Sequence, residues 1–132
     1  MVLVDTNVLV DVLQNDPQWA DWSIDQMRAQ AKLHALAINP VIYAEMSLSF
    51  STLEALDDVV LTMALELREI PRPALFLAAK AFTQYRRRGG SKVQVLPDFF
   101  IGAHAAVQGW PLLTRDASRF RTYFPTLEVL AP

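Results

Sequence analysis

Four acidic side chains stand where a metal site could form. Each follows an apolar segment or opens a predicted helix: Asp5, Glu45, Asp98 and Asp116. Carboxylates that lie close together in apolar surroundings repel one another unless protons or cations compensate their charge. Because the chain has no cysteine and no pair of histidines at ligand spacing, the available ligands are oxygen atoms. Such a ligand set favours a hard divalent cation, Mg²⁺ or Mn²⁺.

Taken singly, each acid also has an ordinary structural explanation. Asp5, Asp98 and Asp116 can cap the helices that follow them. Glu45 can be a polar residue on a solvated helix face. Asp5 and Glu45 are each preceded by an apolar run, however, and a shared cation accounts for all four acids at once.

The elements around these acids alternate between short apolar strands and helices. Strands are predicted at 2–4, 36–38, 67–70, 112–113 and 127–129, and helices at about 7–13, 17–34, 40–49, 52–63, 74–88, 97–107 and 117–123. Short apolar strands separated by helices are typical of a parallel sheet. We therefore predict the α/β class, with a short central parallel sheet and helices on both faces. Functional groups of such folds collect at the carboxyl ends of the strands, where the acids fall.

Size and composition indicate one domain spanning residues 1–132. The chain is 52% hydrophobic, too apolar for a disordered segment. The absence of cysteine excludes a disulfide scaffold and a cysteine nucleophile. No apolar run approaches the roughly 20 residues of a membrane span, and no basic segment precedes 2–4 as in a signal peptide. We therefore expect a cytoplasmic protein. The formal net charge of −2 is a weak guide, because clustered acids would leave the remaining surface basic.

Four segments carry a resemblance to a known family. They are DTNVLVD (5–11), PVIYAE (40–45), LPDFFIGAHA (96–105) and LLTRDASRF (112–120). In this order, over nearly the whole chain, they resemble the motifs of PIN-domain nucleases, and more closely those of VapC-type toxins of bacterial toxin–antitoxin pairs. The resemblance implies a single PIN-like domain that acts as a Mg²⁺-dependent endoribonuclease. It also implies a cognate antitoxin protein and a homodimer.

The resemblance assigns the four acids to catalysis and to the metal site. Thr114 matches a hydroxyl residue that can hydrogen-bond a ligand carboxylate. Thr6 and Asn7 match polar positions after Asp5, with less defined roles. Asp116 matches the position at which family members vary. A metal ion in this site can polarise a phosphodiester and lower the pKa of an attacking water.

A basic segment lies just ahead of Asp98. Four cations fall within seven residues: Arg86, Arg87, Arg88 and Lys92. Cations at the end of a helix complement its dipole, and the same charges can contact RNA phosphates; the sequence leaves both open. The last motif adds cations that could join this set: Arg115, Arg119 and Arg121.

Trp19 and Trp22 lie three residues apart on one face of a predicted helix. Core packing is the ordinary explanation of such a pair. An exposed pair would be a protein-binding surface, which would suit the antitoxin that the resemblance implies.

Other functions remain open. A housekeeping PIN-domain nuclease would process RNA without an antitoxin, and a non-catalytic module would keep the acidic metal site but perform no reaction. A receiver domain of the response-regulator kind also gathers acids around Mg²⁺. It would need a lysine after its last strand, and no lysine follows Lys92.

Overall fold

The computed structural model describes all residues, 1–132, and centres on one five-stranded parallel sheet in the order β3-β2-β1-β4-β5. The strands are β1 (Val2–Val4), β2 (Leu36–Ile38), β3 (Leu65–Leu67), β4 (Leu112–Leu113) and β5 (Val129–Leu130). The middle of the sheet is β1, in which Leu3 pairs with Ala37 on one side and Leu112 on the other. The three central strands are completely buried, as expected for apolar strands covered on both faces.

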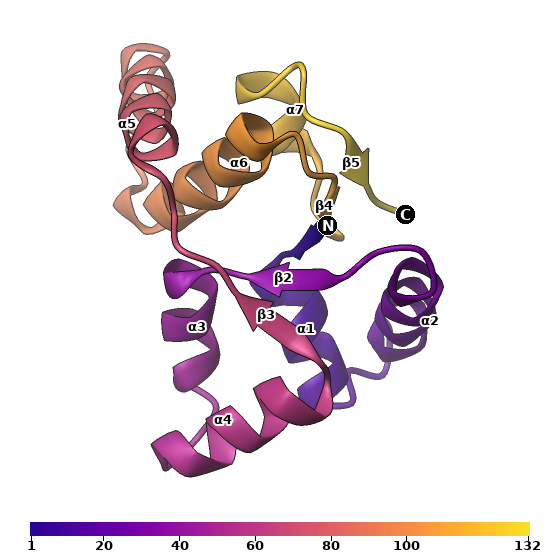
Figure 1. Cartoon of the computed structure of the whole chain (residues 1–132). Coiled ribbons are helices and arrows are strands. Elements are labelled where there is room, and N and C mark those ends of the chain that lie inside the picture. The colour runs from indigo at the N-terminus through magenta and orange to yellow at the C-terminus, as the bar shows by residue number, and fades with distance from the viewer.

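Helices cover both faces of this sheet. They are α1 (Thr6–Leu13), α2 (Ala20–Ala31), α3 (Pro40–Ser47), α4 (Leu53–Thr62), α5 (Arg72–Arg87), a 3₁₀ turn η1 (Val93–Val95), α6 (Leu96–Gln108) and α7 (Ser118–Tyr123). After β3 the chain reverses its direction across the sheet, so right-handed crossovers place α1–α4 on one face and α5–α7 on the other. Figure 1 shows α5, α6 and α7 above β2 and β3, with α3 and α4 below. The predicted fold class is confirmed.

Polar residues at the strand ends begin the helices that follow. The Oδ1 atom of Asn39 accepts the N–H of Ile42 at 2.9 Å, and Pro40 occupies the first turn of α3. Asp5 caps α1 in a similar way through the N–H of Thr6. A polar cap followed by a compatible first turn is a local signal, which explains why the sequence predicted these helix starts.

A buried histidine ties the two helical layers together. His104 of α6 is completely buried, with Nδ1 3.2 Å from the amide nitrogen of Asn39. The amide oxygen of Asn39 is already used by the cap of α3, so the amide donates to Nδ1. Burial lowers the pKa of His104 and so keeps the ring neutral. This contact holds the start of α3 against α6.

The structure differs from the predicted elements at the sheet edges and in α2. The edge strands are β3 at 65–67, where 67–70 was predicted, and β5 at 129–130, where 127–129 was predicted. The second helix begins at Ala20 and not near Pro17, because Asp16 accepts the N–H groups of Gln18 and Trp19, each at 2.9 Å, and holds 16–19 in a turn. None of the helices combines the length and the apolar character needed to cross a bilayer.

Candidate active site

The four acids predicted from the sequence line one cavity of about 320 Å³. Asp5 follows β1, Glu45 lies in α3, Asp98 is in the first turn of α6, and Asp116 follows β4. Parallel strands end at the same edge of a sheet, and a crossover helix that returns toward the next strand begins at that edge. The topology therefore brings together acids that are up to 111 residues apart (116 − 5).

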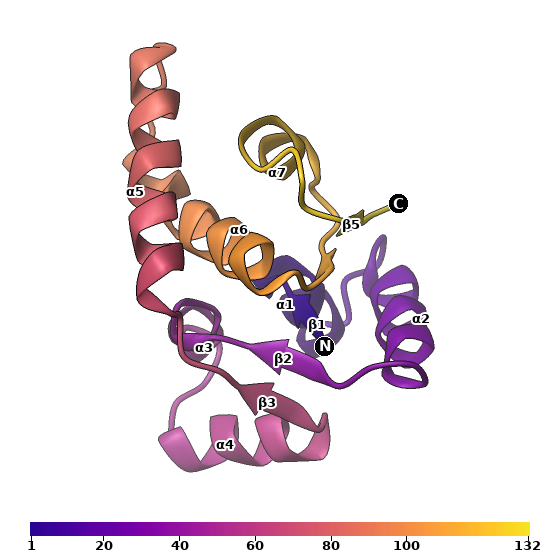
Figure 2. The ribbon, with the colours of Figure 1, turned by 45° about the horizontal axis from the view of Figure 1, so that its top comes forward.

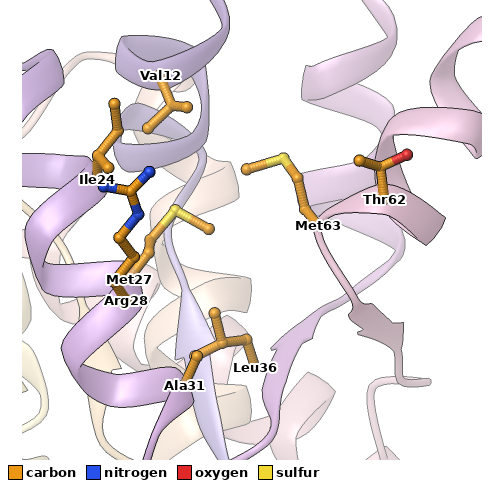
Figure 3. Close-up of a pocket in the computed structure, with 8 residues that line it drawn as sticks. All are labelled: Val12, Ile24, Met27, Arg28, Ala31, Leu36, Thr62 and Met63. Carbon is orange, nitrogen blue, oxygen red and sulfur yellow. The ribbon is translucent and has the colours of Figure 1, made fainter.

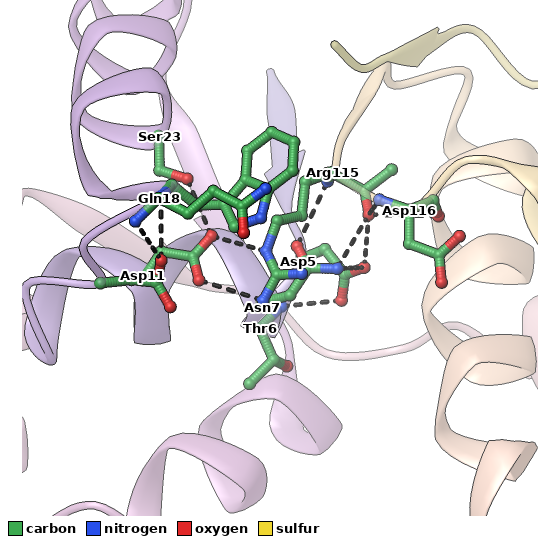
Figure 4. Close-up of polar contacts among 11 residues, drawn as sticks. Asp5, Thr6, Asn7, Asp11, Gln18, Ser23, Arg115 and Asp116 are labelled. Atoms are coloured by element: carbon green, nitrogen blue, oxygen red, sulfur yellow. Dashed lines mark hydrogen bonds and ion pairs between the residues drawn. The ribbon is translucent and has the colours of Figure 1, made fainter.

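Asp5 is the most buried of these acids, at 4% exposed. Its Oδ1 accepts the N–H of Thr6 at 2.7 Å, and its Oδ2 accepts the hydroxyl of Thr114 at 2.8 Å and the amide of Asn7 at 3.3 Å (Figure 4). Burial, followed by the charges of Asp98 and Glu45, raises the pKa of Asp5 to about 7, although the bonds from Thr114 and Thr6 lower it. The metal-free carboxyl is therefore partly protonated at neutral pH.

Thr114 fixes the orientation of the Asp5 carboxylate. Its single hydroxyl hydrogen is donated to Asp5, and its oxygen accepts the Asn7 amide and the backbone N–H of Asp116, each at 3.2 Å. The capacity of a hydroxyl, one donor and two acceptor positions, is thereby filled. The amide oxygen of Asn7 accepts the backbone N–H of Arg115 at 3.3 Å. Thr114 and Asn7 thus join the loop after β4 to the first turn of α1.

Thr6 positions the second acid. Its hydroxyl donates to Oε1 of Glu45 at 2.6 Å, which links the first turn of α1 to the last turn of α3. Burial, and to a smaller extent the charge of Asp98, raises the pKa of Glu45, against the lowering effect of this hydrogen bond. Both residues that follow Asp5 donate to its carboxylate, and their side chains also reach different partners, Glu45 from Thr6 and Thr114 from Asn7.

Asp98 is paired with a cation from α7. Nη1 of Arg119 lies 2.7 Å from Oδ2 of Asp98. Burial still raises the pKa of Asp98, as does the charge of Asp116, while Arg119 lowers it. Asp116 itself is exposed.

The donor set fits a hard divalent cation in its chemistry. The side chains that could hold the ion offer carboxylate oxygens only. The pKa values of Asp5, Glu45 and Asp98 are all raised. A bound cation would therefore offset the cost of burying their negative charges and would reduce the repulsion among them. No group of three or more acidic or histidine side chains is close enough to hold one ion, however. The metal-binding roles of these residues stay predictions.

The basic segment lies outside this cavity. Arg86 and Arg87 end α5, and Arg88 stacks over the ring of Tyr123 in α7, 5.3 Å from its centroid. The backbone N–H of Lys92 donates to the hydroxyl of Tyr85 at 3.1 Å. Figure 2 shows α5 projecting past the sheet, so the segment lies at the far end of this helix. Its predicted contact with RNA stays a prediction.

Sequence reasoning did not identify the role of Asp11, which is buried beside the cavity. Asp11 is 2% exposed and forms a bidentate ion pair with Arg115, at 2.7 and 3.1 Å. A signal for its burial was present, because Asp11 follows Val8 by three positions and so shares the apolar face of α1. Its partner, 104 residues away, left no local signal.

The tryptophan pair is largely packed. Trp19 and Trp22 are half-buried and meet edge to face, with ring centroids 6.2 Å apart. Trp22 packs against the core, and the guanidinium of Arg115 lies over Trp19, 5.7 Å from its centroid. The pair therefore fits the core-packing explanation better than that of an open protein-binding surface.

Comparison with known proteins identifies a family and a fold. The family model described as "PIN domain" matches residues 2–124. Among solved structures, VapBC2 from Rickettsia felis, bound to a DNA fragment from its promoter, has a TM-score of 0.75 at 21% identity, over 100% of this chain and 99% of that one. VapBC-1 from nontypeable Haemophilus influenzae has a TM-score of 0.73 at 16% identity, over 99% and 98%.

A toxin–antitoxin complex from Klebsiella pneumoniae is also similar, with a TM-score of 0.70 at 20% identity, over 100% of this chain and 98% of that one. At these identities the likeness shows a shared fold. No curated protein matches the sequence at a significant level.

Proposed function

Because this chain belongs to the PIN domain family, whose members are generally nucleases that use divalent metal ions, we propose that it is a Mg²⁺-dependent endoribonuclease. The substrate would be RNA, cleaved at internal phosphodiester bonds, with Mn²⁺ as an alternative ion. The observation that carries the proposal is the buried carboxylate of Asp5 in a cavity shared with Glu45, Asp98 and Asp116.

Each residue of the site has a distinct task in this proposal. Asp5, Glu45 and Asp98 would hold the ion after their side chains move closer together than in the metal-free structure, with the exposed Asp116 at their side. When bound, the ion would supply Lewis-acid polarisation of the phosphoryl group and would lower the pKa of a bound water. The Thr114 hydroxyl keeps the Asp5 carboxylate in one orientation, and the Thr6 hydroxyl does the same for Glu45.

Cleavage of an RNA mixture by the purified protein tests this function. We expect products that depend on added Mg²⁺ or Mn²⁺ and disappear in EDTA, and mapping of their ends identifies the bond that is cut. Asp5→Asn and Asp98→Asn should each abolish cleavage while circular dichroism shows an intact fold. Asp21→Asn changes an exposed acid of α2 and serves as the matched control. Full activity of the Asp5→Asn protein would overturn the site assignment, and inactivity of the unsubstituted chain would favour a non-catalytic module.

We further propose that the chain is the toxin of a toxin–antitoxin pair. Its fold is that of a Klebsiella pneumoniae toxin–antitoxin complex and of VapBC structures, and an RNA-cleaving enzyme needs restraint in the cytoplasm, where we expect it to act. Expression of the chain alone should arrest growth, and co-expression of the neighbouring reading frame should restore it. A harmless chain whose purified form cleaves RNA would instead be a housekeeping nuclease.

An apolar groove is the proposed binding site for the antitoxin. It has a volume of about 410 Å³ and is lined by Val12, Ile24, Met27, Arg28, Ala31, Leu36, Thr62 and Met63. The side chains of Met27 and Met63 point toward one another across it (Figure 3). Neither Trp19 nor Trp22 lines this groove. We propose that an apolar segment of the antitoxin docks in this groove. The sequence had instead suggested the tryptophan pair as the docking surface.

The inhibitory group of such a partner would be a cation. An arginine can pair with the carboxylates that otherwise hold metal, so we expect a basic side chain of the antitoxin to reach Asp5 and Asp98. In pull-down and growth assays, Met63→Arg should weaken binding of the co-encoded partner, and Leu48→Arg, at a side chain that is 89% exposed on another surface, should not. Equal binding by both variants would place the partner elsewhere.

The homodimer stays a prediction that comes from the resemblance. Large apolar side chains on α4 and α5 are open to solvent, with Leu61 79% and Phe76 67% exposed, and such residues are commonly covered at protein interfaces. Sedimentation analysis of the purified chain should give twice the monomer mass. A monomer at all concentrations would contradict the prediction.

A further inference from the structure

Arg115 is the only basic residue among those that line the acid cavity. It stands between Thr114 and Asp116, and its backbone N–H is anchored to Asn7 at 3.3 Å. Each nucleotide of an RNA strand brings a negative phosphate, which would meet the carboxylates of the cavity. A cation held inside the cavity would offset this repulsion.

The guanidinium of Arg115 is held on two sides. Its Nε and Nη2 donate to the two carboxylate oxygens of Asp11, at 2.7 and 3.1 Å. Asp11 is buried and also accepts the hydroxyl of Ser23 at 3.1 Å. The ring of Trp19 lies against the guanidinium. Figure 4 shows Asp11 and Arg115 side by side, next to Asp5 and Asn7.

The pairing with Asp11 leaves part of the guanidinium free. An arginine side chain has five N–H donors, and Asp11 accepts two of them. The remaining donors have no protein acceptor, and the side chain is 33% exposed. A buried ion pair adds little net stability compared with apolar residues of similar volume in its place. Stability alone is therefore a weak reason for the pairing of Asp11 with Arg115. The ion pair fixes the guanidinium in one orientation and leaves N–H donors that can bind a phosphate.

We propose that Arg115 binds a phosphate group of the RNA strand within the acid cavity and that Asp11 is the positioning residue that holds it there. The inference rests on the proposed ribonuclease function and adds to it a substrate-binding residue. The basic segment at 86–92, which lies outside the cavity, would contact phosphates farther along the strand.

Equilibrium binding of a short fluorescent RNA tests Arg115 without any need for cleavage. The measurements use the Asp5→Asn chain in EDTA, at several salt concentrations, with and without Arg115→Gln. We expect Arg115→Gln to weaken binding by about tenfold to a hundredfold, as for the loss of hydrogen bonds to a charged group. The slope of log K against log salt should become shallower by about 0.7, the value for one phosphate of a single strand. Lys32→Gln, which removes an exposed cation at the end of α2 that forms no ion pair, is the control.

Asp11→Asn separates positioning from charge. This variant keeps the Arg115 cation, so the salt slope of RNA binding should stay unchanged. Without Asp11 to hold it, however, the guanidinium loses its fixed orientation. Asp11→Asn in the otherwise unsubstituted chain should therefore lower kcat/KM for RNA cleavage with Mg²⁺. If Arg115→Gln only lowers the melting temperature and binds RNA with the affinity and salt slope of Lys32→Gln, the pair is a structural tie and the proposal fails. Cleavage by the unsubstituted chain would then still support the ribonuclease function. If the Asp5→Asn chain binds no RNA, the phosphate proposal fails, and cleavage by the unsubstituted chain alone decides the ribonuclease function.

Discussion

Arg119 and Asp98 form a direct ion pair, with Nη1 of the arginine 2.7 Å from Oδ2 of the aspartate. Arg119 thereby engages the carboxylate of Asp98, which the proposed metal site needs as a ligand. Its side chains are 28% and 32% exposed, so solvent can enter and the arginine can move away. A metal ion at Asp98 would therefore compete with Arg119.

Arg119→Gln should tighten binding of Mn²⁺, because Asp98 no longer has to give up a partner. A partly exposed ion pair contributes roughly 0.2–1 kcal/mol, which corresponds to an affinity gain of about 1.4-fold to fivefold. Removing the arginine also raises the pKa of Asp98, so calorimetry at about pH 8 avoids competition from protons. Arg121→Gln lies two residues farther along α7 and should leave the affinity unchanged. Weaker binding in Arg119→Gln would contradict this competition.

Asp5→Asn should stabilise the metal-free protein, and more so at high pH. The pKa of Asp5 is about 7 in the folded chain against an ordinary value of 3.8. Between these values the folded state binds a proton that the unfolded state has lost, so the free energy of unfolding falls as pH rises. Each unit by which the pKa is raised corresponds to about 1.36 kcal/mol of unfolding free energy lost at high pH. Asparagine does not titrate, so the variant does not suffer this loss.

Thermal melts in EDTA check this expectation. The melting temperature of Asp5→Asn minus that of the unsubstituted chain should grow by several degrees between about pH 4 and about pH 8. Any hydrogen bonds lost in the variant affect both pH values alike and cancel in this comparison. A difference that stays constant over the range would show that the pKa of Asp5 is ordinary.

Metal binding should release a proton in the pH range where Asp5 titrates. The ion binds the carboxylate and displaces the proton that the metal-free chain carries below about pH 7. We therefore expect the affinity for Mn²⁺ to rise from about pH 6 to about pH 8, with proton release visible as a dependence of the binding enthalpy on the buffer. An affinity that does not change with pH would remove Asp5 from the ligand set.

Thr114→Val should damage both stability and the site, whereas Thr114→Ser should not. Valine has nearly the same shape, but it removes the hydroxyl that donates to Asp5 and accepts from Asn7. Leaving such buried groups without partners costs about 1–3 kcal/mol. Loss of the donated bond also raises the pKa of Asp5 further, so metal binding should require a higher pH. Denaturant melts and metal titrations at several pH values distinguish the two variants.

The sequence was most informative where a signal was local. The strands β1, β2 and β4 are continuous apolar runs, and the caps at Asp5 and Asn39 mark helix starts, so these elements were predicted at their places. The acids could be assigned to one sheet edge because the topology of a parallel sheet leaves few alternatives. Their arrangement in one cavity follows from this rule.

Features that depend on distant partners could not be predicted. The edge strand β3 buries only Leu65 and exposes Glu66 and Leu67, so its hydrophobic pattern does not fix its limits. The ion pairs of Asp11 with Arg115 and of Asp98 with Arg119 join segments that are 104 and 21 residues apart. No spacing rule within one helix or strand indicates such partners.

The central place of β1 sets the order in which the proposed active site can form during synthesis. One edge of this strand pairs with β2 and the other with β4, at residues 112–113. A chain on the ribosome emerges from its N-terminus, so it carries Asp5 and Glu45 through most of translation without the last acid of the cavity or the strand that closes the sheet. Under the proposed function, an unfinished chain would be unable to cut RNA, and a restraining partner would have the whole time of translation in which to be present.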